Sequence, residues 1–372
     1  MYNIEQSMIR LIFIGGFLGA GKTTALTIIA ESLLSRGIKV GILTNDQTEN
    51  LVDTEIVKIK LSHKNIPIEE VTKGCFCCQF HSLIDRINAI ASTKNRPEVI
   101  LAEPVGSCTD LIASVINPIK KYYRDRFEIA PFTVLVEPNR LNNFLKNAGL
   151  FPKEVMYIFD KQMEEADIIA LNKIDTLHKD QIENLLSYLK SRYPGKPVIA
   201  LSIKQKIGIE KWINMLFDSF PTKALQHIDY GKYAKGEAKL GWLNAIIKMR
   251  SSTKEYVNKF SLDLLISIKQ KFLNMKAEIG HLKFIVSTGN KMLHGSLTSV
   301  KDEPKLEGDD LSSENEWIFI INVRANMNPE DLSKMIMSTI EKVSGTYKIM
   351  CKILRLTSLA PTYPNPPYIL RQ

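Results

Sequence analysis

Residues 16–23 read Gly16-Phe17-Leu18-Gly19-Ala20-Gly21-Lys22-Thr23, which is the complete G-x-x-x-x-G-K-[ST] pattern of a phosphate-binding loop. An apolar run at Ile9–Gly15 precedes the loop and a helical pattern at Thr23–Ser35 follows it, as this motif requires. Backbone amides of the loop and the positive end of the next helix can face phosphate oxygens. We therefore predict a nucleotide site at the following residues: Gly16, Gly19, Ala20, Gly21, Lys22, Thr23 and Thr24.

Short apolar runs alternate with helical patterns in the first part of the chain, which predicts an α/β domain with a mostly parallel sheet covered by helices. A helix is also expected at His81–Ala91. Sites in such sheets lie at the carboxyl ends of the strands, so the residues that follow each strand are the ones to inspect. The further strands are expected at Lys39–Leu43, Val99–Ala102, Phe132–Val136, Ile168–Leu171 and Val198–Leu201.

The pattern weakens around residues 221–236, so we predict domains at 1–222 and 238–358, joined by a linker at 223–237. The second pattern predicts a smaller α+β domain with helices on one face, close to a ferredoxin-like split βαβ arrangement. Acidic residues 301–316 are expected to form a mobile loop, and residues 359–372 an extended tail. The elements are expected at Leu240–Met249, Val257–Ile279 (helix), Leu282–Val286, Lys291–Leu297, Trp317–Val323, Pro329–Val343 (helix) and Tyr347–Leu356.

Asn172-Lys173-Ile174-Asp175 follows an apolar strand with the spacing of a guanine-recognition motif. The Asp175 carboxylate can accept from the ring NH and the exocyclic amine of guanine, and Lys173 can stack its stem over the base. Ser202, after the last strand, can cap the base edge. A lone Asn-Lys-x-Asp is also typical of a helix start, because Asp is a good N-cap. The phosphate loop upstream favours guanine, so GTP and GDP are the expected ligands.

Two further strand ends are candidates for sensing the γ-phosphate. Glu103-Pro104-Val105-Gly106 follows the strand at Val99–Ala102. Glu103 can hold Mg²⁺ through water or orient the attacking water, and the Gly106 amide can bond to the γ-phosphate. Asp46 can bind Mg²⁺ or position water, although Asn45-Asp46 alone is typical of a turn. Lys22 is expected at the β- and γ-phosphates and Thr23 on Mg²⁺, which makes Lys22, Asp46, Glu103 and Gly106 the expected catalytic residues.

Three of the five cysteines lie together in Gly74-Cys75-Phe76-Cys77-Cys78. Thiolates suit Zn²⁺, Co²⁺ or Cu⁺, whereas a hard ion such as Mg²⁺ prefers oxygen. Adjacent Cys77 and Cys78 can pair only with strain, so a reducing cytoplasm is expected in place of a disulfide framework. Cys75, Cys77 and Cys78 are therefore predicted to bind a transition metal. The alternative is a set of partly buried or redox-sensitive thiols without metal.

The fourth ligand of that metal stays open at this stage. A Cys-x-Cys-Cys loop is too compact to close a tetrahedral site by itself, so a further ligand or an exchangeable position is expected. His81 lies one helical turn beyond Cys78. Cys108 lies two residues past Gly106, although a small core-facing cysteine is the simpler interpretation of that residue.

The composition narrows the classes of partner. The chain has 372 residues and a net charge of +9. A basic chain can bind nucleic acid, but arginines and aromatic residues are not interleaved here, so we do not expect a nucleic-acid partner. No run of 18 apolar residues is present, so no membrane span is expected.

Together these motifs resemble the GTPase family of CobW, UreG, HypB and MeaB, with the CobW-like branch the most similar. The resemblance rests on residues 15–24, 74–78 and 171–175 and on Glu103-x-x-Gly106, and it covers roughly residues 8–220. It implies a P-loop NTPase domain of the SIMIBI type, followed by a domain similar to the CobW C-terminal domain. Members of this family resemble metal insertases or metallochaperones that deliver zinc, cobalt, nickel or a cobalamin-type cofactor by slow GTP hydrolysis.

The resemblance implies a slow GTPase that carries zinc or cobalt to a client metalloprotein. The alternative is a MeaB-like chaperone that gates cofactor loading of a cobalamin- or corrinoid-dependent enzyme. No arginine finger is identifiable in the sequence, so intrinsic turnover is expected to be slow. The six histidines are scattered, and residues 322–329 differ from the Arg-Pro-Phe-His-Pro-like signature of typical members, so the client can differ. The oligomeric state stays open, a homodimer included.

Overall fold

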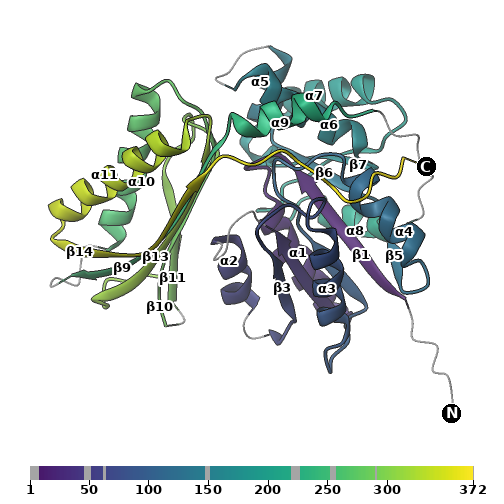
Figure 1. Cartoon of the computed structure of the whole chain (residues 1–372), viewed down its shortest axis with the longest axis horizontal. Coiled ribbons are helices and arrows are strands. Elements are labelled where there is room, and N and C mark those ends of the chain that lie inside the picture. The colour runs from purple at the N-terminus through teal and green to yellow at the C-terminus, as the bar shows by residue number, and fades with distance from the viewer. Residues whose placement is uncertain are drawn as a thin grey trace.

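A computed structural model of the chain describes residues 8–45, 52–61, 64–146, 151–218, 227–251, 257–289 and 291–371. These residues form an eight-stranded and a six-stranded sheet, each with its own helices (Figure 1). Within the described ranges, no helix combines the length and the apolar character needed to cross a membrane.

The first sheet is parallel throughout, with the strand order β3-β2-β4-β1-β6-β7-β8 and β5 paired to β1. Most of its strands are nearly continuous apolar runs, because helices cover both faces of a parallel sheet. The strands are β1 Ile9–Gly16, β2 Val40–Asn45, β3 Ile68–Val71, β4 Val99–Ala102, β5 Phe127–Ile129, β6 Thr133–Val136, β7 Ile168–Leu171 and β8 Val198–Ala200. The helices are α1 Lys22–Ser35, α2 Val52–Leu61, α3 Phe80–Ala91, α4 Asn117–Tyr122, α5 Pro138–Leu145, α6 Lys153–Glu165, α7 Lys179–Arg192 and α8 Ile209–Phe217.

The phosphate-loop motif leaves the central strand of this sheet. After β1 the chain first builds β2 to β4 on one side and later β6 to β8 on the other. This is the topological switch point at which open α/β sheets bind their ligands. The predicted α/β class with a parallel sheet is thereby confirmed.

The second sheet is antiparallel, with the strand order β12-β11-β10-β13-β9-β14. Strand β13 separates β9 from β10, and β9 separates β13 from β14, so two split βαβ units interleave as predicted. Helices α10 and α11 lie on the outer face (Figure 1). The elements are α9 Tyr230–Ala238, β9 Gly241–Ser251, α10 Val257–Asn274, β10 Ile279–Thr288, β11 Lys291–Leu297, β12 Lys305–Gly308, β13 Glu316–Ala325, α11 Pro329–Thr346 and β14 Ile349–Leu359.

Three predicted boundaries in this region need correction. The helix expected at Val257–Ile279 ends at Asn274, because Lys276 adopts a left-handed conformation (φ 51°) that a helix cannot contain. The stretch 301–316 contains strand β12, which pairs with β11. Residues 230–237 of the expected linker belong to helix α9, because the fully buried Tyr233 anchors them in the first core.

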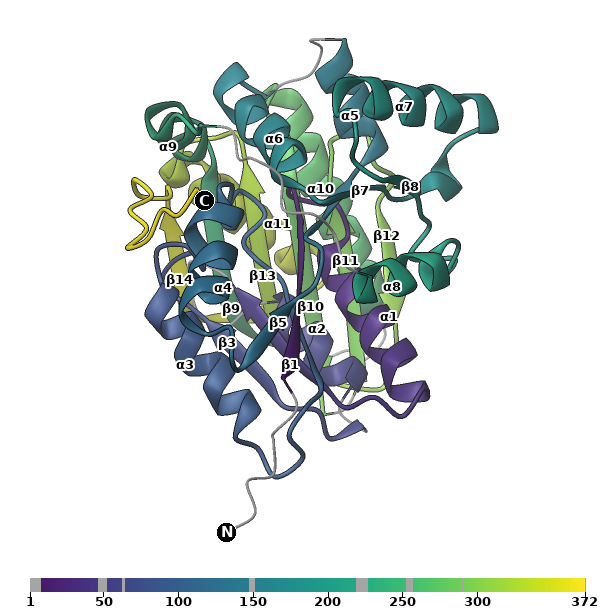
Figure 2. The same ribbon diagram turned by 90° about the vertical axis from the view of Figure 1, so that its right-hand side faces the viewer.

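The inner face of the second sheet packs against the first domain through helix α2. Figure 2 shows this sheet behind the first domain, with its strands in order from β14 to β12. The Val52 amide donates to Asn322 Oδ1 at 2.9 Å. An apolar contact surrounds this bond and joins α2 to β10, β11 and β13. The second domain is thereby held over the carboxyl ends of the parallel strands.

The tail after β14 runs back across the first domain to the region of α4 (Figure 1). The ring of Tyr368 packs on that of Phe80, with the centroids 5.0 Å apart. Arg371 donates two hydrogen bonds of 2.8 Å to the buried carboxylate of Asp110. The end of the chain is thereby fastened to the segment that follows β4.

Candidate functional site: a nucleotide cavity beside a thiol cluster

The phosphate loop opens into a cavity of about 150 Å³ that lies between the two domains. A second cavity, of about 500 Å³, adjoins it and reaches the residues after β7. The first-domain lining of the smaller cavity includes Gly19, Gly21, Lys22, Thr23, Thr24, Asn45, Asp53, Lys173 and the segment Glu103–Gly106. The second domain contributes Trp242, His281, Lys283, Ser296, Thr298 and Arg324.

The phosphate loop has the conformation that its glycines permit. Gly16 and Gly21 have φ values of 135° and 97°, which other residues rarely adopt. A Cβ atom at Gly16 would lie 2.5 Å from the Leu135 carbonyl oxygen, so no side chain fits there. Lys22 donates from Nζ to the Gly16 carbonyl at 3.0 Å, which holds its ammonium over the loop.

Two carboxylates, that of the buried Glu103 and that of the partly buried Asp53, converge on the hydroxyl of Thr23. Asp53 Oδ1 lies 2.9 Å and Glu103 Oε1 lies 3.1 Å from Thr23 Oγ1. Burial, together with the charge of Asp53, raises the pKa of Glu103 to about 7. Burial also acts to raise the pKa of Asp53, but the charge and hydrogen bond of Lys283 outweigh it and lower that pKa.

This hydroxyl and these carboxylates fit a Mg²⁺ ion. The second carboxylate oxygen of Glu103 is buried and has no hydrogen-bond partner among the described residues. Such an oxygen costs free energy unless a donor or a cation satisfies it. Oxygen ligands of this kind are the ones that Mg²⁺ prefers.

The predicted guanine-recognition residues meet at the end of the larger cavity. Ser202 donates from its hydroxyl to Asp175 Oδ1 at 2.5 Å. Asn172 donates to the Ala20 carbonyl at 2.8 Å, which ties this motif to the phosphate loop. Lys173 and Asp175 line the cavity. The structure therefore brings the four predicted side chains to one place.

Asn45 connects the smaller cavity, called the nucleotide cavity below, to the cysteine loop. Its amide donates to the carbonyls of Val71 and Gly74 at 2.9 and 2.8 Å, and its Oδ1 accepts from the Phe76 amide at 2.8 Å. The last two bonds flank Cys75, so one buried side chain of the cavity wall fixes the cysteine loop. Its neighbour Asp46, the predicted catalytic residue, lies outside the described residues.

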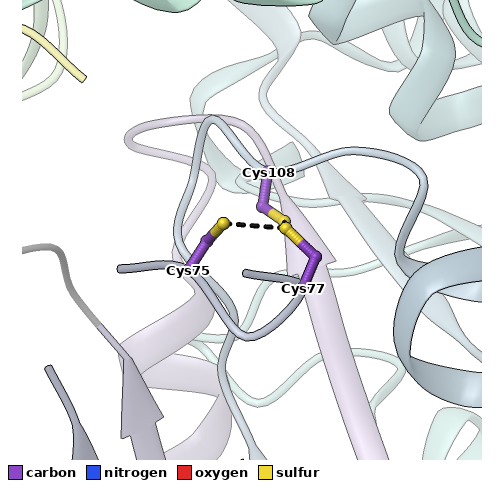
Figure 3. A group of neighbouring side chains, drawn as sticks. All are labelled: Cys75, Cys77 and Cys108. Carbon is purple, nitrogen blue, oxygen red and sulfur yellow. Dashed lines mark hydrogen bonds between the residues drawn. The ribbon is translucent and has the colours of Figure 1, made fainter. Parts of the chain in front are cut away.

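The thiols of Cys75, Cys77 and Cys108 form a buried cluster, with all three sulfurs within 4.8 Å of one another (Figure 3). The Cys77 and Cys108 sulfurs are 3.6 Å apart, and those of Cys75 and Cys77 are 2.7 Å apart. Thiolates with Zn–S bonds of about 2.3 Å lie about 3.8 Å apart in a tetrahedral site. The Cys77–Cys108 spacing already fits such a site, and Cys75 has to move outward by about 1 Å to fit the same geometry.

The remaining ligand candidates lie at the edge of this thiol cluster. Cys78 is outside the mutually close group, although its sulfur is 3.8 Å from that of Cys77. The backbone amide of Asn365, in the tail, donates to Cys78 Sγ at 3.3 Å. His81 is exposed and packs its ring against Phe80. Of the two candidates for a further ligand, the structure brings Cys108 into the cluster.

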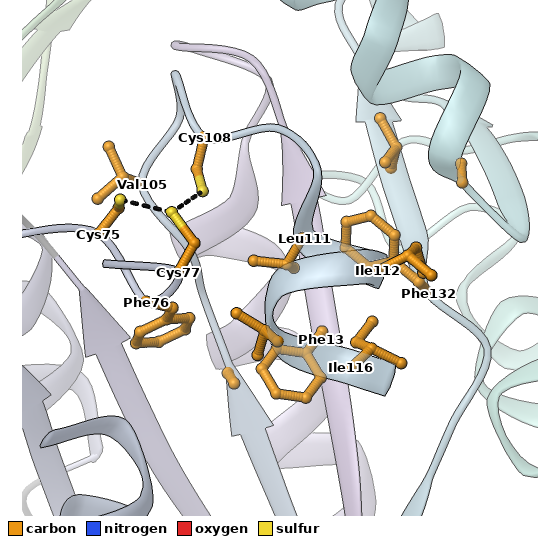
Figure 4. Packing of buried hydrophobic residues seen from close by; sticks show 14 of the residues in the cluster. Phe13, Cys75, Phe76, Cys77, Val105, Cys108, Leu111, Ile112, Ile116 and Phe132 are labelled. Carbon is orange, nitrogen blue, oxygen red and sulfur yellow. Dashed lines mark hydrogen bonds between the residues drawn. The ribbon is translucent and has the colours of Figure 1, made fainter. Parts of the chain in front are cut away.

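The thiol cluster stabilises one thiolate in an apolar setting. Hydrogen bonds from Cys75 and Cys77 lower the pKa of Cys108 to about 6. The same bonds raise the pKa of Cys75 and Cys77. Phe76 and Val105 pack around the sulfurs (Figure 4). Because the thiolate is the form that binds metal, this cluster suits a soft cation, whose binding releases protons.

The segment Glu103–Cys108 runs from the nucleotide cavity to the thiol cluster. A Cβ atom on Gly106 would lie 3.0 Å from Lys22 Nζ, so this glycine permits a close approach to the phosphate loop. Gln162 of α6 donates to the carbonyls of Gly106 and Cys108 at 3.0 and 2.8 Å. One short segment therefore touches both sites.

Comparison with known proteins identifies the family of the first domain. Residues 10–200, just over half of the chain, match the family described as CobW/HypB/UreG, nucleotide-binding domain. The chain belongs to the CobW/HypB/UreG family. This membership confirms the resemblance that the sequence motifs indicated.

Two curated relatives of this CobW-family chain are named for zinc. The "Zinc-regulated GTPase metalloprotein activator 1" of Dictyostelium discoideum is 23% identical over 249 residues, covering 60% of this chain and 51% of the relative. The "Zinc chaperone CobW" of Sinorhizobium sp is 24% identical over 211 residues, covering 52% of this chain and 59% of the relative. The matches thus span between half and three fifths of these relatives. Neither relative supports the corrinoid-enzyme alternative.

Two solved structures are similar to this CobW-family chain. The crystal structure of Zn(II)-bound YjiA GTPase from E. coli has a TM-score of 0.38 at 13% identity, covering 91% of this chain and 99% of YjiA. The crystal structure of hydrogenase maturation factor HypB from Archaeoglobus fulgidus has a TM-score of 0.40 at 20% identity, covering 56% of this chain and 88% of HypB.

Sequence reasoning missed three charged residues that line the smaller cavity of this CobW-family chain, namely Asp53, Lys283 and Arg324. In the sequence, Asp53 is only an acidic residue in the first turn of a helix. Acidic residues are common at that position because they stabilise the helix, so they do not indicate a site. Lys283 and Arg324 lie on separate strands of the other domain, and no local spacing connects them to the phosphate loop.

Proposed function

We propose that this CobW-family chain is a GTP-hydrolysing metal chaperone that carries Zn²⁺ on Cys75, Cys77 and Cys108. The position of Cys108 carries the proposal, because it joins the thiol cluster and lies two residues after the segment Glu103–Gly106, which lines the nucleotide cavity. The two relatives named for zinc favour Zn²⁺ over Co²⁺. Delivery of the metal implies a client metalloprotein.

In this proposal the nucleotide lies along both cavities. The phosphate loop and Lys22 hold the phosphates, and Asn172, Lys173, Asp175 and Ser202 hold guanine. Thr23, Asp53 and Glu103 hold Mg²⁺, which supplies charge neutralisation at the β- and γ-phosphates when bound. The Gly106 amide bonds to the γ-phosphate. Catalytic roles for Lys22, Asp46, Glu103 and Gly106 remain predictions.

The coupling in this proposal is mechanical. Asn45 and the segment Glu103–Cys108 each touch the nucleotide cavity on one side and the thiol cluster on the other. A shift of either on loss of the γ-phosphate changes the spacing of the sulfurs. Three thiolates leave the fourth position of a tetrahedral ion to an exchanging ligand. A client can therefore take the ion by ligand exchange when the nucleotide state loosens the cluster.

The decisive experiment measures zinc affinity in two nucleotide states. Full-length protein is purified without oxygen, and Zn²⁺ is titrated against a chromophoric chelator with GDP or with a non-hydrolysable GTP analogue. We expect one Zn²⁺ per chain and affinities that differ at least ten-fold, about 1.4 kcal/mol, between the states. Absence of bound Zn²⁺ in both states, or equal affinity in both, contradicts the proposal.

Asn45→Ala is expected to lower zinc affinity by about ten-fold, because partners that orient metal ligands contribute ten- to a hundred-fold. Removing the amide also leaves three buried backbone groups without their partner, so the free energy of unfolding should fall by about 2 kcal/mol. Chelator competition and thermal melting measure the two effects. Asn88→Ala is the matched control, since Asn88 bonds to an exposed Arg126 on the surface. Unchanged zinc affinity in a folded Asn45→Ala protein rules out this link.

A further inference from the structure

The second domain supplies positive charge to the nucleotide cavity. Lys283 on β10 and Arg324 on β13 line its wall. His281 lies beside them, but burial lowers its pKa well below the usual value, so it is neutral. In the first-domain wall, two carboxylates oppose two lysines: Asp53, Glu103, Lys22 and Lys173. In this smaller cavity, the positive excess that the phosphates of a nucleoside triphosphate require therefore comes from the second domain.

Lys283 reaches the end of the phosphate loop from the second domain, through Asp53 of α2. Its Nζ lies 2.6 Å from Asp53 Oδ1, and the same oxygen lies 2.9 Å from Thr23 Oγ1. One oxygen of Asp53 thus lies between the Lys283 ammonium and the hydroxyl of Thr23, the residue after Lys22. The side chains of Lys283 and Asp53 are 19% and 20% exposed, so the pair is partly shielded from solvent.

The strand that carries Lys283 fixes where the ammonium can go. Strand β10 is an interior strand of its sheet, pairing with β11 on one side and β13 on the other. Lys283 pairs in register with Ser296 and Asn322, and Asn322 accepts from α2. Pairing on both sides holds the Lys283 backbone in place, and its side chain lines both cavities, so the ammonium can change its partner inside them.

Asp53 has two competing cationic partners. It belongs to the oxygen set proposed for Mg²⁺, and it pairs with Lys283 in the structure. An ammonium released from Asp53 stays in the cavity that the phosphate loop lines, where the proposed pose places the γ-phosphate. A lysine ammonium has three donors and serves phosphate well as a point charge.

We propose that Lys283 is the phosphate-contacting residue that the second domain supplies to bound GTP. It exchanges Asp53 for a γ-phosphate oxygen, so GTP ties the two domains together and GDP does not. This inference rests on the proposed binding of GTP. Lys283 would then supply, from the same chain, a positive charge at the γ-phosphate. The sequence indicated no arginine finger for that role.

The test compares nucleotide affinities of full-length variants by calorimetry in the presence of Mg²⁺. Lys283→Met is expected to weaken binding of a non-hydrolysable GTP analogue by about ten- to a hundred-fold, the usual value of a hydrogen bond to a charged group. GDP binding should change by less than about three-fold. Lys248→Met is the matched control, since Lys248 pairs with Glu316 in the same sheet without lining the cavity. Its affinities should match those of the wild type.

A double-variant cycle separates phosphate contact from simple neutralisation of Asp53. If Lys283 only neutralises Asp53, adding Lys283→Met to Asp53→Asn leaves the affinity for the GTP analogue unchanged, and the inference is overturned. If Lys283 contacts phosphate, the affinity still falls at least ten-fold. The double variant removes both charges of the Lys283–Asp53 pair, so neither charge is left without its partner. It can therefore still be tested if Lys283→Met alone does not fold. A wild-type protein that does not bind the GTP analogue refutes the proposed function itself.

Discussion

Replacing Cys108 with alanine is expected to lower the zinc affinity of the full-length protein by more than about a hundred-fold. Loss of a residue that only orients a metal ligand lowers the affinity by about ten- to a hundred-fold. Cys108 is 31 positions from Cys77 in sequence, yet the two sulfurs lie 3.6 Å apart in a buried setting. Without it, two clustered thiols remain, and two ligands do not hold a tetrahedral ion in competition with a chelator. Substitution by alanine removes little volume, so the fold should persist.

Chelator competition with GDP-bound protein measures this loss, and two other cysteines provide the controls. Cys351→Ala changes an exposed thiol on β14 and should leave zinc affinity within about two-fold of the wild type. Cys78→Ala should cost less than Cys108→Ala, because Cys78 lies outside the mutually close group. If Cys78→Ala abolishes binding and Cys108→Ala does not, the compact loop alone binds the metal.

The fold could be predicted where burial leaves a simple pattern. The expected strands at Val99–Ala102, Ile168–Leu171 and Lys291–Leu297 have the same bounds as β4, β7 and β11. The first two are fully buried runs of apolar residues, which a parallel sheet requires. Strand β3, Ile68–Val71, was not predicted, because it lies at the sheet edge and contains two glutamates. Edge strands have only one paired side and carry a weaker pattern.

The candidate site could be predicted where its residues form local motifs or directly follow a predicted strand. The phosphate loop and the residues after β7 are local motifs, and the structure places both along the cavities. The roles of Asn45 and Gln162 depend on side chains reaching backbone groups of another loop. Lys283 comes from a different domain. These contacts form because elements far apart in the sequence pack together. No local spacing in a single sequence predicts them.

Replacing Lys22 with alanine is expected to lower the rate of GTP hydrolysis by at least about a hundred-fold, since removing one donor that stabilises transition-state charge costs 10²–10³. Lys22 sits over the loop at 3.0 Å from the Gly16 carbonyl and lines the cavity beside Glu103. In the proposed pose its ammonium moves to the β- and γ-phosphates. Phosphate release under saturating GTP measures the rate, which is expected to be slow even in the wild type.

The same variant tests whether nucleotide binding controls the thiol cluster. Lys22 is not part of that cluster, so Lys22→Ala should still bind one Zn²⁺ with the affinity of the nucleotide-free wild type. Its zinc affinity should no longer respond to the GTP analogue, because the γ-phosphate has lost its main cation. Lys211→Ala, on the exposed surface of α8, is the matched control and should behave as the wild type in both assays.

If phosphate release in Lys22→Ala equals that of the wild type, hydrolysis does not occur at this loop. A zinc affinity that still changes with the GTP analogue shows that coupling uses another route.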